Sequence, residues 1–397
     1  MITKIFIPIL IAIVLPDIYF YLRYIRKRKH KARRLAMLLL PSIMMAVATV
    51  GLVTSRNFAP KDMSVMNTYL LLLALLVVPK LVFFLSSLFG TLCSRIVRTL
   101  FKKARQHPAR NYGNITGWIF VLLIWYISIY GSTAGFHQLN VRHVEYISAS
   151  LPASFDGYKI VHFSDAHVGT YQSCTDILRE YVDSINAQDA DAVMFTGDLQ
   201  NREPQELYPC IDILSTIKAK DGVYSVLGNH DYANYIHASP STKVANERET
   251  VRLIRQMGWH LLVNDHVAVR RSSDSIVVAG MANDGDSIHF PRLGDIQKTL
   301  NGVNPEAFVT MLEHDPSSWR RKILPESHAQ LTLSGHTHAM QFALFGWSPA
   351  SLIYDEWGGM FFEGDRAINV STGLGGFIPF RFGMPSEIVV ITLRKKR

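Results

Sequence analysis

The side chains best suited to chemistry are aspartate, asparagine and histidine residues gathered in five short blocks. The blocks are Asp165-Ala-His167, Gly197-Asp198, Gly228-Asn229-His230-Asp231, His314 and Gly335-His336-Thr337-His338. Carboxylate and amide oxygens combined with imidazole nitrogens, without thiolate, suit Mn, Fe or Zn. Seven candidate ligands, Asp165, His167, Asp198, Asn229, His314, His336 and His338, are too many for one tetrahedral zinc. They predict two divalent metal ions roughly 4 Å apart that share one carboxylate.

Each block follows a segment with the pattern of a strand. Short apolar runs rich in β-branched residues predict strands at 159–164, 191–196, 223–227, 275–279, 307–312, 330–333, 367–370 and 388–393, and helices are predicted at 174–186, 206–217 and 246–257. This alternation predicts an α/β fold, a four-layer-type mixed β-sandwich flanked by helices. Because ligands bind beyond the carboxyl ends of strands in open α/β sheets, the five blocks should converge on one site.

The N-terminal third of the chain has a different character. Residues 1–136 hold 18 Lys and Arg residues against two acids, a net charge of +16, whereas residues 137–397 hold 23 against 30, a net charge of −7. Four apolar runs, 5–22, 35–54, 68–88 and 115–136, are long enough to cross a bilayer. We therefore expect a membrane anchor of about four transmembrane helices at 1–136, a linker at 137–154 and an α/β domain at 155–397.

The basic residues predict the orientation in the membrane. Fourteen Lys and Arg residues lie in the loops 23–34 and 91–114, whereas the opposite side has three before the last span, Lys4, Arg56 and Lys61. The positive-inside rule places both basic loops in the cytoplasm. The chain is then a multi-pass plasma (inner) membrane protein with its α/β domain on the extracytoplasmic side. Because apolar runs flank the basic clusters, we expect membrane lipids as partners and no nucleic acid.

The five blocks, in this order, resemble the calcineurin-like metallophosphoesterases, and the ending 371–387 is similar to their bacterial membrane-associated branch. The resemblance covers residues 156–393 and implies a dinuclear-metal phosphoesterase, a hydrolase acting on ester bonds. One metal would take Asp165, His167, Asp198 and His338, and the second would take Asp198, Asn229, His314 and His336. A hydroxide between the metals would attack phosphorus. His230 would stabilise the developing charge or protonate the leaving oxygen, with Asp231 orienting it.

Three features outside the ligand blocks bear on this resemblance. Members of the family often carry an acid three residues after the bridging aspartate, where this chain has Asn201. Arg381 is a candidate contact for a substrate phosphate, with a surface ion pair as the alternative. Cys174 and Cys210 lie in the domain expected outside the cytoplasm, and the sequence leaves open whether they pair or stay as free thiols.

An apolar, aromatic segment suggests the type of substrate. Residues 340–360 include Phe342, Phe345, Trp347, Leu352, Ile353, Tyr354 and Trp357. Such a segment is typical of a rim that faces the bilayer, although ordinary strand packing is an alternative.

We therefore expect a membrane-anchored metal-dependent phosphohydrolase that cleaves phosphoester or pyrophosphate bonds, with a phosphorylated lipid or lipid-linked pyrophosphate as the leading substrate. A soluble phosphoester is the alternative substrate. A non-catalytic metal-binding membrane sensor or transport accessory protein is the alternative function.

Overall fold

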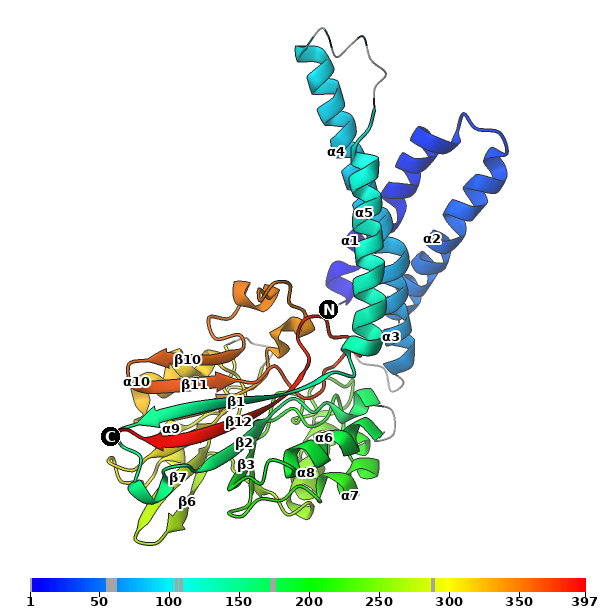
Figure 1. Ribbon diagram of the computed structural model, residues 1–397. Coiled ribbons are helices and arrows are strands. Elements are labelled where there is room, and N and C mark those ends of the chain that lie inside the picture. The colour runs from blue at the N-terminus through cyan, green and yellow to red at the C-terminus, as the bar shows by residue number, and fades with distance from the viewer. Residues whose placement is uncertain are drawn as a thin grey trace. The chain divides into compact units, whose positions relative to one another are not determined.

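The computed structural model describes residues 2–54, 63–101, 103, 106, 110–171, 176–286 and 290–397. The chain forms two compact units, one helical (Met1–Ser132) and one containing all the described strands (Thr133–Arg397). Figure 1 shows the helices of the first unit and the sheets of the second. Cys174 lies outside the described residues, while Cys210 is disulfide-bonded and Cys93 is free.

The helical unit contains long apolar helices. Its elements are α1 (Ile2–Phe20) with the π-helical turn η1 (Tyr21–Ile25), α2 (Lys31–Thr54), α3 (Met63–Leu72) leading through η2 (Leu73–Val77) into α4 (Val78–Leu100), and α5 (Gly113–Tyr130), which continues as η4 (Gly131–Gly135). In the described part of the chain, four helices are long and apolar enough to cross a membrane: Ile5–Ile25, Lys31–Thr54, Met63–Leu100 and Gly113–Gly135. This confirms the predicted transmembrane helical region, although the third helix is longer than expected and reaches into the second basic loop.

The two charged residues inside the apolar runs form a pair. The Nζ atom of Lys80 on α4 lies 2.5 Å from Oδ1 of Asp17 on α1, and it also contacts the Ser42 hydroxyl on α2. An unpaired charge within a membrane span is expensive. Because the two charges are paired, the energetic cost of each within its helix is reduced. The contacts of Lys80 also join α4 to α1 and α2.

Two six-stranded mixed sheets form the centre of the second unit. The first has the order β1 (Leu139–Ser148), β12 (Ser386–Lys395), β2 (Lys159–Phe163), β3 (Ala192–Phe195), β4 (Val223–Ser225) and β5 (His260–Leu261). The second has the order β10 (Gly359–Glu363), β11 (Arg366–Val370), β9 (Leu331–Ser334), β8 (Val309–Leu312), β7 (Asp274–Gly280) and β6 (Asp265–Arg271). Strands β2 to β5 run parallel to one another, as do β11, β9, β8 and β7. Strands β12, β10 and β6 are antiparallel to β2, β11 and β7, respectively. The carboxyl ends of the parallel strands β2, β3, β4, β8 and β9 can therefore meet.

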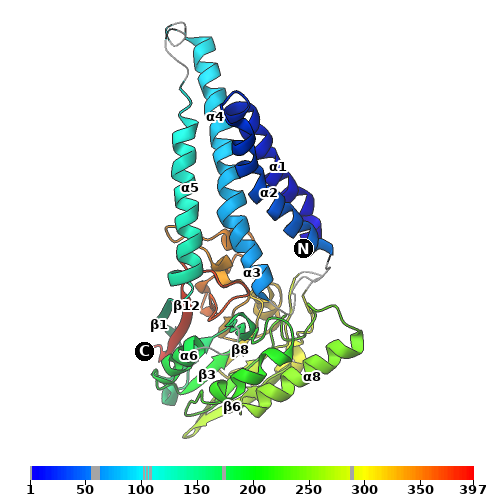
Figure 2. The ribbon, with the colours of Figure 1, turned by 90° about the vertical axis from the view of Figure 1, so that its right-hand side faces the viewer.

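Side chains alternate across these strands and divide the core into layers. On β2, Val161 and Phe163 pack against helices on the outer face, whereas Ile160 faces the second sheet. The outer helices of the first sheet are α6 (Asp176–Asn186), α7 (Ile211–Leu214) and α8 (Pro240–Gln256), and Figure 2 shows α6 and α8 on the side of β3. The far face of the second sheet packs against α9 (Ile296–Thr299), η9 (Trp319–Ile323) and α10 (Leu324–Glu326). The remaining short helical turns are η5 (Ala153–Phe155), η6 (Val168–Tyr171), η7 (Pro204–Glu206), η8 (Tyr208–Cys210), η10 (His338–Gln341) and η11 (Pro349–Leu352). This confirms the predicted four-layer α/β sandwich.

Two predictions about individual segments are wrong. The predicted linker 137–154 contains β1, which pairs with β12 over its full length. β1 is an edge strand with exposed polar and charged positions, so it lacks the apolar run of a buried strand. The predicted helix 206–217 is broken into η8 and α7, because Pro209 lies within it and cannot donate a helical hydrogen bond.

Candidate metal centre

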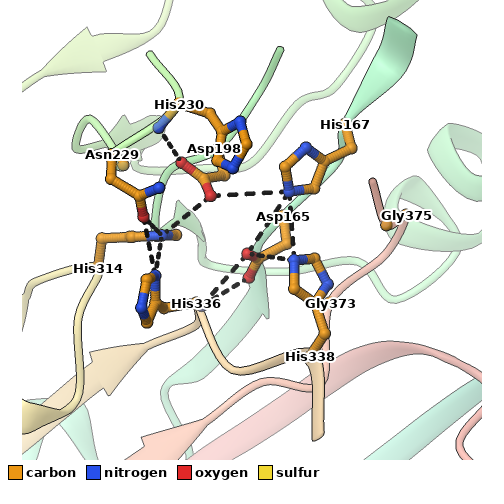
Figure 3. Close-up of polar contacts among 12 residues, drawn as sticks. Asp165, His167, Asp198, Asn229, His230, His314, His336, His338, Gly373 and Gly375 are labelled. Atoms are coloured by element: carbon orange, nitrogen blue, oxygen red, sulfur yellow. Dashed lines mark hydrogen bonds and ion pairs between the residues drawn. The ribbon is translucent and has the colours of Figure 1, made fainter. Parts of the chain in front are cut away.

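All seven predicted ligands lie just beyond strand ends. Asp165 and His167 follow β2, Asp198 follows β3 and Asn229 follows β4. From the second sheet, His314 follows β8, and His336 and His338 follow β9. Figure 3 shows these side chains pointing toward one another from both sheets. The site therefore lies where the carboxyl ends of five strands meet, the position that a layered α/β fold favours for a ligand.

The first group of candidate ligands gathers around Asp165. Its Oδ1 atom lies 3.2 Å from Nε2 of His338 and 4.0 Å from Nε2 of His167. The two imidazole Nε2 atoms are 3.2 Å apart. These three residues offer ligand atoms that all lie within 4.8 Å of one another, the spacing that one ion could bridge.

The second group gathers around His314. Its Nε2 atom lies 3.1 Å from Oδ1 of Asn229 and 3.3 Å from Nδ1 of His336. The Asp198 carboxylate joins both groups, because its Oδ2 atom is 3.2 Å from Nε2 of His314 and 3.6 Å from Nε2 of His167. One carboxylate oxygen thus faces both groups, as a bridging ligand must.

The chemistry of these contacts fits cations. Ring nitrogens of different histidines face each other within 3.3 Å, with carboxylate and amide oxygens around them. Converging lone pairs in a buried site are unfavourable unless a positive charge lies between them. The donor set of oxygen and nitrogen atoms without sulfur is that of divalent Mn, Fe or Zn.

The backbone at the ligands is strained. Five of the seven have a positive φ: Asp165 (53°), His167 (44°), Asp198 (60°), His336 (72°) and His338 (49°). Each such residue costs about 1–3 kcal/mol, and such strain clusters at functional sites. The neighbouring chain is also packed closely, because a Cβ atom on Gly228 would overlap the Asp198 carboxylate. Only glycine at 228 leaves room for this carboxylate.

Electrostatics in the site favour neutral rings at His167 and His338 but positive charge at His314, beside an ionised Asp198. Burial lowers the pKa of His167 to about 3 and that of His338 to about 4. Burial opposes the charge of Asp198, but His314 and His230 outweigh it and hold the pKa of this carboxyl well below its ordinary value. Burial likewise opposes a charge on His314, yet Asp198 and Asp165 raise its pKa well above the ordinary range. The two carboxylates therefore favour positive charge where the groups meet, which a divalent cation supplies.

Comparison with known proteins agrees with this geometry. Residues 158–340 match the family described as calcineurin-like phosphoesterase, and residues 3–136 match its "probable calcineurin-like phosphoesterase, transmembrane domain". The chain belongs to the calcineurin-like metallophosphoesterases. It is 28% identical to a transmembrane protein with metallophosphoesterase domain from Danio rerio, over 79% of this chain and 71% of that protein.

Two bacterial relatives of this metallophosphoesterase are also similar. The uncharacterized metallophosphoesterase YkuE from Bacillus subtilis is 29% identical, over 65% of this chain and 86% of its own. The UDP-2,3-diacylglucosamine pyrophosphatase LpxG from Chlamydia trachomatis is 26% identical, over 64% of this chain and 89% of its own. The helical unit and the candidate metal-ligand groups are thus features of a membrane-associated metallophosphoesterase.

Hydrogen bonds behind the ligands of this metallophosphoesterase orient their rings. The side-chain amide of Asn201, which stands where family members often carry an acid, lies 3.0 Å from His167 Nδ1 and 2.8 Å from the Thr170 hydroxyl. His314 Nδ1 donates to the Thr196 carbonyl at 2.7 Å. Such partners fix the tautomer so that the other ring nitrogen faces the metal. Asn201 therefore orients a candidate metal ligand.

The side chains of His230 and Asp231 have different hydrogen-bond partners. The Nδ1 atom of His230 lies 2.6 Å from the main-chain carbonyl of Asn201, and its ring lies near His167 and Asp198. The buried Asp231 carboxylate instead accepts hydrogen bonds from main-chain amides, including those of Asp198 at 2.8 Å and Gly228 at 2.9 Å. The expectation that Asp231 orients His230 is therefore wrong. Asp231 holds the loop that carries Asp198.

Arg381 is also placed differently from the prediction. Its side chain is fully buried, and its guanidinium donates to the main-chain carbonyls of Thr372, Gly373, Gly375, Met384 and Pro385. The guanidinium thereby holds the loop that passes His338. This loop lies close to the His338 ring, because a Cβ atom on Gly373 would be 2.9 Å from Nδ1 of that ring. The predicted contact between Arg381 and a substrate phosphate is not supported, and we assign it this positioning role.

Two tyrosines beside the site were not predicted. The Tyr235 hydroxyl accepts a hydrogen bond from Asn229 Nδ2 at 2.8 Å, and its ring lies 4.3 Å from that of His230. The Tyr354 hydroxyl lies 3.1 Å from Nε2 of His336. Neither tyrosine stands in a recognisable motif, although Tyr354 belongs to the aromatic segment noted in the sequence. Both orient candidate ligands from outside the metal groups.

The aromatic segment has an exposed apolar part next to the site. Leu344, Phe345, Trp347, Leu352 and Ile353 are exposed, with Phe345 wholly so. Other members of the segment are packed, since Phe342 stacks on Phe382 with centroids 5.7 Å apart. We call residues 344–353 the apolar loop. The next residue, Tyr354, contacts the candidate ligand His336, so the loop borders the metal centre.

Proposed function

We propose that this metallophosphoesterase hydrolyses phosphoester or pyrophosphate bonds with a pair of divalent ions, Mn, Fe or Zn. The observation that carries the proposal is the convergence of two ligand groups that share the Asp198 carboxylate. Asp165, His167, Asp198 and His338 hold one ion, and Asp198, Asn229, His314 and His336 hold the other. Such a pair, when bound, lowers the pKa of water to supply a nucleophile and neutralises charge on the phosphoryl oxygens.

Residues around the ions complete the site. His230 donates through Nδ1 to the Asn201 carbonyl, which leaves Nε2 to face the site. In the protonated ring Nε2 also carries a hydrogen and donates to an oxygen of the substrate. In this role it stabilises charge on the phosphoryl group or protonates the leaving oxygen, and we propose it as the catalytic acid. Asp231, Asn201, Tyr235 and Tyr354 act as positioning residues, because each contacts the chain or side chain of a candidate ligand.

The proposed substrate is a phosphorylated lipid or a lipid-linked pyrophosphate. The support is the apolar loop, which borders the metal centre and exposes side chains that water disfavours. The printed name of LpxG, a pyrophosphatase of UDP-2,3-diacylglucosamine, is consistent with a substrate that combines a pyrophosphate and acyl chains. The loop would contact acyl chains while the phosphate lies at the metals.

Changing Phe345 and Leu352 together to serine is expected to lower turnover of a lipid phosphate in vesicles by about tenfold or more. Full burial of each apolar side chain contributes roughly 1.5–3 kcal/mol, and partial contact of both with acyl chains contributes a fraction of that sum. The loss on a soluble chromogenic phosphodiester should be much smaller. Val244→Ser with Leu293→Ser is the matched control, since both side chains are exposed elsewhere on the same unit. Equal losses on both substrates would argue against a lipid contact.

The proposed location is a plasma (inner) membrane with the catalytic unit outside the cytoplasm. The support is the excess of basic residues in the loops 23–34 and 91–114. A reporter that is active only outside the cytoplasm, fused after Arg397, should be active, and a reporter that requires the cytoplasm should be silent. The reverse pattern would contradict the proposed orientation.

A further inference from the structure

The helical unit contains a cavity that is lined by positively charged side chains. It has a volume of about 660 Å³ and lies between the end of η1, the last turns of α4 and the chain that enters α5. Its lining residues are Arg23, Thr91, Ser94, Arg95, Arg98, Thr99, Arg110 and Asn111. We call it the arginine pocket. The two basic loops that the charge pattern assigns to one side of the membrane thus contribute to a single cavity.

The charge of the arginine pocket is not balanced by carboxylates of its own lining. Its described lining contains four arginines and no acid. Asp17, the one acid among the described residues of the helical unit, lies 2.5 Å from Lys80 and is not among the lining residues. Four guanidinium groups around one cavity repel one another, so their summed positive charge attracts an anion into it.

A partly buried polar network holds the floor of the pocket in place. Asn111 Nδ2 lies 3.0 Å from the Thr91 hydroxyl and 2.9 Å from the Ser87 carbonyl, and Asn111 Oδ1 accepts the Gly113 amide at 3.0 Å. The backbones also approach closely, because a Cβ on Gly90 would overlap Asn111 Oδ1. The Tyr24 hydroxyl joins η1 to the same network through Ser87 Oγ at 2.7 Å. The elements that carry the arginines are therefore fixed relative to one another.

The groups in the pocket match a phosphate. Guanidinium groups bind phosphate oxygens through paired N–H donors, and threonine, serine and asparagine side chains add neutral donors. Exposed apolar side chains, Leu92, Ile96 and Leu100, lie on the same stretch of α4 and offer a surface for acyl chains. Basic pockets between membrane helices are typical sites for anionic lipid headgroups.

We propose that the arginine pocket binds a phosphate-bearing anion, and that the apolar side chains beside it favour an anionic phospholipid headgroup over free phosphate. The site is separate from the metal centre and does not depend on the hydrolytic activity. It gives the helical unit a binding role in addition to that of an anchor.

The test is equilibrium binding to the full chain in neutral detergent at about 150 mM salt, where diffuse surface attraction is screened. The probes are short-chain phosphatidylglycerol, short-chain phosphatidylcholine and inorganic phosphate. The pocket variant is Arg95→Gln with Arg110→Gln, and the control is Arg33→Gln with Arg34→Gln, two exposed arginines on α2 that do not line the pocket. Both pairs remove the same charge, and unchanged helicity with a single elution peak shows that each variant is folded.

We expect saturable binding of phosphatidylglycerol that weakens by about tenfold or more in the pocket variant and by less than about twofold in the control. A single Arg23→Gln change, on a different element, should also weaken it. Equal losses in the pocket variant and the control, or no saturable binding of phosphatidylglycerol or phosphate, would overturn the proposal. Binding of inorganic phosphate as tight as that of the lipid would support an anion site but overturn the preference for a lipid.

Discussion

Replacing Asp198 with asparagine should reduce metal-dependent hydrolysis by roughly 10³-fold or more, because this carboxylate is the one group shared by both ligand groups. Its Oδ2 atom faces His314 at 3.2 Å and His167 at 3.6 Å, while Oδ1 accepts the His230 amide at 2.8 Å. The amide has the same shape but removes the negative charge between the two ions, where several kcal/mol of electrostatic stabilisation depend on it. Metal content and turnover should fall together.

The matched control for this variant is Asp183→Asn. Asp183 is an exposed aspartate on α6, outside both ligand groups, and its substitution removes the same charge from the same unit. Turnover should be measured by steady-state kinetics and metal content by elemental analysis. Full activity of Asp198→Asn with both metals retained would contradict the bridging role.

Replacing His230 with alanine should lower turnover by about 10²–10⁴-fold, the usual contribution of a positioned proton donor. The metals should remain bound, because the seven proposed ligands are intact and His230 belongs to neither of the two ligand sets. The loss should be greater for a substrate with an alkoxide leaving group than for one with a nitrophenolate, since a good leaving group needs no proton. This dependence distinguishes a proton donor from a residue that only maintains the fold.

His237→Ala is the control for His230, because this histidine is exposed in the same loop region. Three measurements decide the matter: turnover on both substrates, metal content and thermal unfolding. Loss of one metal in His230→Ala would identify the residue as a ligand, and an equal loss on both substrates would exclude it as the donor to the leaving oxygen.

Much of the fold was predictable because its strands are buried on both faces and therefore consist of continuous apolar runs. A run such as that of β3 stands out in the sequence, and the polar blocks that end the strands indicate where they meet. The edge strand β1 escaped prediction for the opposite reason, since its exposed face carries charge. The four long apolar helices were predictable from length and composition alone.

The parts of the site that were not predictable depend on contacts between distant segments. The pairing of Tyr354 with His336, the burial of Arg381 and the amide contacts of Asp231 are set by how loops pack, and no local pattern records them. Arg381 illustrates the difficulty. An arginine near a phosphate site suggests substrate binding, but here five carbonyl groups surround it. Motifs therefore indicated the ligands, whereas the residues that orient them required the structure.

The two ligand groups that share Asp198 are proposed to bind a pair of metals that supports hydrolysis. The most direct measurement strips the full chain of metal, reloads it with Mn, Zn or Fe, and follows metal content together with hydrolysis of a chromogenic phosphodiester and a phosphomonoester. We expect no turnover in the stripped protein and a rise in turnover that is complete when two ions are bound per chain. Turnover that persists without metal, or that is complete with one ion per chain, would contradict this proposal.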